Sequence, residues 1–134
     1  MWKQKLGAKV TLANQEWRTF LSTRSQQNFQ LARGSWCGGY NEASAFLILL
    51  HSGANVNDGK FSSVRFDELL MQARTAADPQ LLYTEIEQII ADEVPVIPVY
   101  HEAGNYMLDT DLGGWPIQNV EQNWYSKDLY KIAE

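Results

Sequence analysis

One ten-residue stretch organises this sequence: Arg33-Gly34-Ser35-Trp36-Cys37-Gly38-Gly39-Tyr40-Asn41-Glu42. It follows an alternating segment typical of a strand, bends at its glycines, and leads into an apolar helix expected from about Ala43 to Leu50. A strand end that opens onto such a bend presents backbone N–H and C=O groups outward. Arg33 adds a fixed positive charge and Trp36 a flat ring, so the stretch contains the parts that hold a small charged ligand.

Residues 35–42 form the glycine bend. The segments before it alternate between predicted helices and short strands. Their spacing predicts a helix at 2–6, a strand at 8–12, a helix from about Trp17 and a strand at 29–33. Strands separated by helices of this length usually lie parallel and are joined by right-handed crossovers. The order therefore predicts an α/β fold.

Two amphipathic helices are predicted after the glycine bend. The first has one apolar face, formed by Phe66, Leu69, Leu70 and Ala73. Asp78-Pro79 combines a capping carboxylate with a proline, which is typical of the start of a helix. The second helix continues the buried stripe with Leu82, Ile86, Ile89 and Ile90.

The C-terminal part of the sequence has a different character. Residues 94–100, Val-Pro-Val-Ile-Pro-Val-Tyr, are rich in β-formers, and their two prolines suit an edge strand or an irregular crossing strand. After about Gly104, large aromatic residues follow neither helical nor strand periodicity: Trp115, Trp124, Tyr125 and Tyr130. These rings need a surface to bury against, which favours docking on another body.

Composition excludes several classes of function. The chain has 134 residues, enough for one domain with a substantial core, and its 11 Lys and Arg against 16 Asp and Glu give a net charge of -5. An acidic chain without a basic stripe is not expected to bind nucleic acid. The longest apolar run, 45–50, is far shorter than the ~20 residues of a membrane span. His101-Glu102 has no second histidine nearby, so a zinc site is not expected. No other metal site and no cofactor is predicted.

Short motifs spread along the chain form a specific combination. They are Trp2-Lys3, Leu6-Gly7, Asn14-Gln15-Glu16-Trp17, Thr19-Phe20-Leu21, Ala32-Arg33, Trp36-Cys37, Tyr40-Asn41-Glu42 and the proline-rich run at 94–100. With these motifs the chain resembles the periplasmic peptide-binding proteins of ABC importers, solute-binding protein family 5, and most closely their oligopeptide-binding and murein-tripeptide-binding branch. The resemblance spans nearly the whole chain, although the proline-rich run is shared more widely across the superfamily.

The resemblance implies a fold and a role. The chain looks like the C-terminal lobe of a two-lobed, type II-like binding protein, with a mixed sheet flanked by helices. Residues 1–103 would form part of this ligand-binding lobe, and residues 104–134 a tail that crosses the hinge toward an N-terminal lobe that is mostly absent. The whole protein would capture peptides or peptide-like ligands, such as murein peptides, in the periplasm and deliver them to permease subunits, without catalysis. Its signal peptide would lie outside this sequence.

The resemblance also implies a set of ligand-binding residues: Trp17, Arg24, Arg33, Ser35, Trp36, Cys37 and Gly39. The two tryptophans look like pocket walls, the two arginines like partners for a ligand carboxylate, and Ser35 and Cys37 like sources of backbone hydrogen bonds. Where peptide binders of this branch carry an Asp that pairs with the ligand's α-amino group, this sequence has Gly39. Either another carboxylate replaces that charge, or the ligand is not an ordinary free-amino peptide.

Two alternative functions compete with this interpretation. A strand followed by Trp36-Cys37-Gly38 and a helix resembles the active-site turn of thioredoxin-like oxidoreductases, which favours a monothiol enzyme using Cys37, although Tyr40 stands where a second cysteine belongs. Without an enzymatic role, Cys37 is a buried, inert residue or, by the resemblance, half of a disulfide whose partner lies outside the chain. The aromatic C-terminal part also suits a freestanding interaction module, or self-association of the chain by itself.

Overall fold

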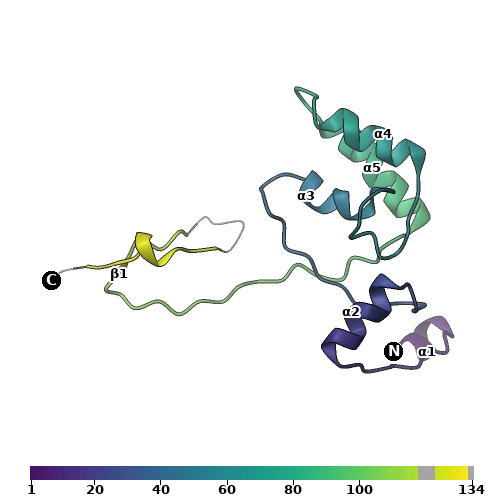
Figure 1. The fold of residues 1–134 in the computed structure, drawn as a ribbon, viewed down its shortest axis with the longest axis horizontal. Helices are drawn as coiled ribbons and strands as arrows, with labels where there is room; N and C mark the ends of the chain where they lie inside the picture. Colours follow the sequence, from purple (N-terminus) through teal and green to yellow (C-terminus); the bar gives the residue numbers. More distant parts are fainter. Residues whose placement is uncertain (118–122, 133–134) are drawn as a thin grey trace. The chain divides into compact units, whose positions relative to one another are not determined.

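The computed structural model describes residues 1–117 and 123–132 (Figure 1). The chain forms two compact units, Met1–Gly34 and Ser35–Glu134. The boundary falls directly before the glycine bend. Arg24 and Arg33 therefore belong to the first unit, and the bend belongs to the second. The division predicted near residue 103 rests on the resemblance and stays a prediction.

The first unit contains two helices. Helix α1, Trp2–Leu6, ends at Gly7, whose φ of 66° lies in the left-handed region that glycine adopts without strain. Helix α2, Trp17–Ser25, begins after Glu16, whose carboxylate accepts two hydrogen bonds from backbone N–H groups of the first turn. The Glu16 cap satisfies backbone donors that have no partner inside the helix. Both predicted helices are confirmed.

The core of the second unit is a helix pair (Figure 1). Helix α4, Val64–Ala73, is capped by the Ser63 hydroxyl, and helix α5, Gln80–Glu93, follows an Asp78 carboxylate that accepts from the Gln80 N–H at 3.1 Å. Their buried faces form one hydrophobic cluster: Phe66, Leu69, Leu70, Ala73, Tyr83 and Ile86. The apolar stripe predicted on the first helix is fully buried. On the second helix Ile86 is buried, and Leu82, Ile89 and Ile90 pack partly buried against the cluster.

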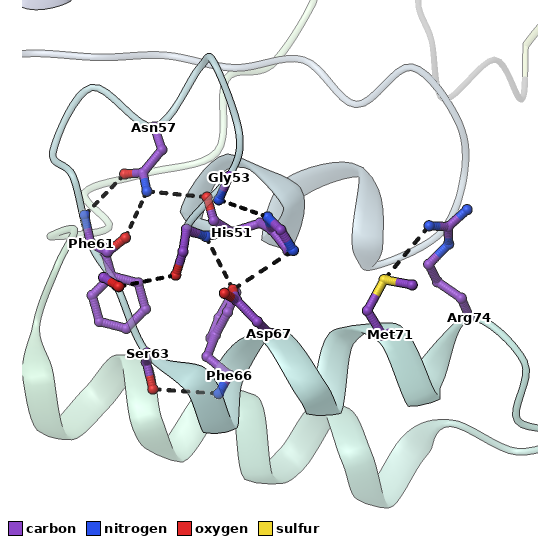
Figure 2. A network of polar contacts seen from close by, with 11 residues as sticks. His51, Gly53, Asn57, Phe61, Ser63, Phe66, Asp67, Met71 and Arg74 are labelled. Atoms are coloured by element: carbon purple, nitrogen blue, oxygen red, sulfur yellow. Dashed lines mark hydrogen bonds and ion pairs between the residues drawn. The ribbon is translucent and has the colours of Figure 1, made fainter.

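The helix expected at 43–50 is shorter and tighter than predicted. Helix α3, Ser44–Leu47, passes into a 3-10 turn, η1, Ile48–Leu50. In the loop that follows η1 and leads to α4, the Asn57 side chain bonds to the backbone on both sides (Figure 2). Its amide donates to the His51 and Phe61 carbonyls at 3.2 and 2.8 Å and accepts from the Phe61 N–H at 3.1 Å. The Asn57 side chain therefore acts as the backbone partner that this loop lacks.

The strands predicted at 8–12, 29–33 and 94–100 do not form within the described residues. The sheet found there pairs β1, Leu112–Gly113, antiparallel with β2, Tyr130–Lys131. Alternation marks which side chains share a face, but a strand also needs a neighbour to complete its hydrogen-bond ladder. The expected parallel pairing is therefore wrong for the described part of the chain, because these segments find no partner strand in it.

The C-terminal aromatic residues partly bury against one another. Tyr106, Trp115 and Trp124 form a cluster with ring centroids 4.9 to 5.6 Å apart. The Tyr130 ring lies against Gly113 so closely that a Cβ there would collide with it. Glycine at this position thus lets the two short strands pair. None of the helices in the described ranges is long and apolar enough to cross a membrane.

Candidate ligand-binding site

One face of α2 combines aromatic rings with a positive charge. Trp17, Phe20 and Arg24 are spaced at i, i+3 and i+7, so they lie along the same side of the helix. The Trp17 and Phe20 ring centroids are 5.8 Å apart, and the Arg24 Cζ lies 5.7 Å from the centroid of Phe20. Trp17 is 65% exposed. The Trp17 ring is therefore accessible, as a pocket wall requires, and it is not buried as a core residue would be.

Arg24 also lies beside the start of the glycine-rich stretch. A Cβ placed on Gly34 would be 3.9 Å from Nη2 of Arg24, so the guanidinium runs along this part of the backbone. Arg33, the preceding residue, is exposed. The structure thus brings one predicted arginine to the chain segment that carries the other. Their pairing with a ligand carboxylate stays a prediction.

In the second unit, the glycine bend folds back onto α3. The Trp36 indole N–H donates to the Ala45 carbonyl at 3.0 Å, and about half of the Trp36 surface remains exposed. A Cβ on Gly38 would lie 3.0 Å from the Phe46 ring, so this glycine allows the close approach. Ser35 and Cys37 are exposed. The bend therefore holds its tryptophan in a fixed place while leaving the ring accessible.

A polar cluster made of Tyr40, Glu42, Ser44 and Tyr83, the Glu42 cluster, connects the bend to α5. The Tyr40 and Ser44 hydroxyls are 2.8 Å apart, and the Ser44 N–H donates to the Glu42 carboxylate at 2.9 Å. The hydroxyls of Ser44 and Tyr83 donate to the same carboxylate. Two hydroxyls and a backbone amide thus converge on one negative charge.

The electrostatics of this cluster follow from those contacts. Burial, together with the hydrogen bond to Glu42 and the negative charge there, raises the pKa of Tyr83 to about 12. Burial opposes ionisation of Glu42, but the hydrogen bonds from Ser44 and Tyr83 outweigh it and lower the pKa of this carboxyl below its usual value. The cluster therefore consists of an ionised Glu42 and a neutral Tyr83 at physiological pH.

The Glu42 cluster is not among the features that the sequence motifs predict. Those motifs contain Glu42 but not Tyr83. A signal was available, because Tyr83 is adjacent to Leu82 and three positions before Ile86 on a buried helix face. A buried tyrosine hydroxyl usually has a hydrogen-bond partner, and that partner had to come from outside the helix.

Cys37 differs from two of its predicted forms. It is a free and exposed cysteine, so the interpretation as a buried, inert residue is wrong. Helix α3 begins only at Ser44, so the thiol is not placed at a helix N-terminus as an oxidoreductase turn requires. Across the described ranges, no three His, Cys, Asp or Glu side chains are grouped to hold a metal ion.

Gly39 has open space where a Cβ would lie. A Cβ there would meet nothing within 4 Å, and its φ lies outside the left-handed region. The fold does not require glycine at this position. Position 39 therefore has room for a side chain, and the local structure does not explain why the residue is glycine.

No protein-family model matches the chain. It is 40% identical over 132 residues to the probable deoxycholate-binding periplasmic protein YgiS of Escherichia coli (strain K12), covering 96% of this chain and 25% of that protein. It is 33% identical over 135 residues to the periplasmic oligopeptide-binding protein OppA of the same strain, covering 98% and 25%. The structure of the Escherichia coli murein tripeptide binding protein MppA matches with a TM-score of 0.84 at 36% identity, over 99% of this chain and 27% of that one.

These similarities extend over nearly all of the chain, which spans about a quarter of the length of the relatives it matches. They confirm the predicted α/β lobe of a two-lobed protein as its fold. They do not support the thioredoxin-like alternative.

Proposed function

Because the chain belongs to solute-binding protein family 5, the periplasmic peptide-binding proteins of ABC importers, we propose that it forms part of the ligand-binding lobe of such a protein. The whole protein captures peptides or peptide-like ligands, such as murein peptides, in the periplasm and delivers them to permease subunits. It binds and releases its ligand without changing it. The observation that carries this proposal is the 33 to 40% identity to periplasmic binding proteins over nearly the full chain.

Within each unit, the proposed site residues suit the recognition of a small charged ligand. Trp17 and Trp36 offer accessible rings as walls, and Arg24 and Arg33 offer forked donors for a carboxylate. Ser35, Cys37 and Gly39 lie on the exposed glycine bend, where an extended ligand reaches the backbone. These roles agree with the exposure of each residue.

A second candidate ligand is an amphipathic carboxylate without an ammonium group. Gly39 has no carboxylate that could pair with a ligand's α-amino group, although a side chain would fit at this position. A relative at 40% identity is described as a probable deoxycholate-binding protein. A bile acid has a carboxylate that suits an arginine and an apolar face that suits a tryptophan ring, and it needs no negative partner at position 39.

Calorimetric titration of the full-length protein that contains this chain distinguishes these ligands. The panel consists of a short peptide, its N-acetylated form, a murein-type tripeptide and deoxycholate. Binding of the free peptide but not of the acetylated one indicates a carboxylate elsewhere that replaces the missing Asp. Binding of deoxycholate alone supports the second candidate, and no binding of any of the four contradicts the proposed function.

Gly39→Asp sharpens the same experiment. The new carboxylate fits without a collision, so the variant is expected to gain affinity for the free peptide about tenfold over the acetylated one, the usual size of a charge-assisted hydrogen bond. Gly39→Asn is the matched control, because it has nearly the same shape without the charge. Equal behaviour of the two variants would show that position 39 does not face the ligand's amino group.

We further propose that the chain by itself associates with copies of itself. The segment 94–100 exposes Ile97, Val99 and Tyr100, and Met107 is fully exposed a few residues later. Unpaired, apolar extended segments are prone to pair with other chains. Light scattering over a hundredfold range of concentration should give a rising mass, and a constant monomer mass would contradict the proposal.

A further inference from the structure

The glycine bend has little hydrophobic anchoring of its own. Most of its residues are exposed, and the buried cluster of the second unit is formed by α4 and α5. The side chains of the bend instead make polar contacts: Trp36 to the α3 backbone, Tyr40 to Ser44, and Glu42 to Ser44 and Tyr83. Of these contacts, the one from Glu42 to Tyr83 reaches across 41 residues to α5.

We propose that Glu42 and Tyr83 are positioning residues that fix the glycine bend for ligand binding. This inference rests on the proposed function, but neither residue is among the predicted ligand contacts. The Tyr83 ring is buried in the hydrophobic cluster, and its hydroxyl donates a hydrogen bond to Glu42. Glu42 follows Trp36 by six positions, within the same bend.

The geometry explains how the contact acts at a distance. The Glu42 carboxylate also accepts from the Ser44 N–H at the start of α3, and Trp36 donates to Ala45, the next residue of that helix. Holding Glu42 therefore holds the beginning of α3, which in turn holds the Trp36 ring. A bend that is ordered before the ligand arrives spares the entropy of ordering it during binding.

Tyr83→Phe tests the proposal with least disturbance, because the ring and its packing remain. We expect ligand affinity of the full-length protein to fall about tenfold, the effect of losing one hydrogen bond to a charged group. Amide hydrogen exchange of residues 36–45 should speed up by a similar factor, while exchange in α4 and the rest of α5 stays unchanged. Glu42→Gln keeps an acceptor for one of the donors, so it should lie between wild type and Glu42→Ala.

Glu85→Gln is the matched control on the same helix. It removes an exposed ion pair to Arg65 on α4 and does not touch the Glu42 cluster. It should leave both the exchange at 36–45 and the ligand affinity unchanged. An equal loss of affinity in this control would show that any weakening of α5 suffices, and would overturn the proposal.

The two readouts separate this inference from the proposed function. If the wild-type protein binds none of the ligand panel, the proposed function fails and the ligand role of Glu42 fails with it, while hydrogen exchange still tests the ordering of the bend. If Tyr83→Phe loosens residues 36–45 but leaves affinity unchanged, the positioning role is wrong. Unchanged exchange at 36–45, or faster exchange throughout α4 and α5, also overturns it.

Discussion

The α4–α5 helix pair and the glycine bend are held in place by different forces. In the helix pair, Phe66, Leu69, Leu70 and Ile86 are at most 1% exposed. The bend is mostly exposed and is held by hydrogen bonds to α3 and α5. Burial of apolar surface is strong and has no direction, whereas hydrogen bonds add less net free energy but fix orientation. Most of the stability therefore comes from the helix pair, whereas hydrogen bonds orient the part of the proposed site that lies on the bend.

The largest expected effect comes from the helix pair. Phe66→Ala removes a fully buried ring that also packs edge-on against Phe61, with ring centroids 5.4 Å apart. We expect the free energy of unfolding to fall by about 3 to 5 kcal/mol, measured by urea denaturation. Leu81→Ala on α5 is the control, because Leu81 is 83% exposed, and it should change stability by less than about 0.5 kcal/mol. Similar losses in both variants would contradict the assignment of the core.

A smaller loss is expected in the loop between η1 and α4, where a polar residue is as buried as the core. Asn57 is 2% exposed and makes three hydrogen bonds to the loop backbone (Figure 2). Asn57→Ala leaves those backbone groups without their partner, which should cost about 2 kcal/mol in the same denaturation assay.

Asn55→Ala is the matched control in this loop, because Asn55 is exposed. It should unfold at nearly the same urea concentration as the wild type. If Asn57→Ala matches it, water replaces the lost hydrogen bonds and the loop does not depend on its asparagine.

Sequence was a good guide where a helix buries one face. The spacing of Phe66, Leu69, Leu70 and Ala73 identified α4, and Asp78-Pro79 located the start of α5. Local signals suffice there, because helical hydrogen bonds and caps lie within a few residues of each other. The segments at 8–12 and 29–33 have a strand's alternation, but a strand depends on a neighbour that the local sequence does not specify.

The candidate site shows the same limit. Trp17, Trp36 and Arg33 belong to the motifs that carry the family resemblance. The role of Arg24 follows from the same resemblance, and residue spacing alone predicts none of these roles. The Glu42 cluster was missed because Glu42 and Tyr83 are 41 residues apart and meet only after α5 has packed. Helical periodicity places Tyr83 on the buried face of α5, but it does not show which distant residue is its hydrogen-bond partner.

The Glu42 cluster allows a pH test of the polar side of the comparison. Because the pKa of Tyr83 is raised to about 12, an unfolded chain loses this proton from about pH 10 while the folded chain keeps it. The contribution of Tyr83 is fully present below pH 10 and is lost as the pH rises toward 12. Tyr83→Phe should reduce the free energy of unfolding by about 1.5 kcal/mol at pH 7, because a hydrogen bond to a charged group is lost, and it should remove this alkaline decline.

Denaturation curves at several pH values compare the two proteins, because other groups that titrate in this range cancel in the difference. Parallel curves for wild type and Tyr83→Phe would contradict the contact with Glu42. A difference that narrows between pH 10 and 12 supports it.

The smallest expected effect belongs to a polar contact on the surface of the helix pair. Arg65 donates to Glu85 at 2.6 Å, but both side chains are about half exposed. Water screens such a pair, so Glu85→Gln should change the free energy of unfolding by less than about 1 kcal/mol, and 1 M salt should reduce the difference further. A loss as large as that of Asn57→Ala would show that polar contacts outside the bend and the loop also carry stability. The division between an apolar source of stability and a polar source of orientation would then be wrong for α4 and α5 themselves.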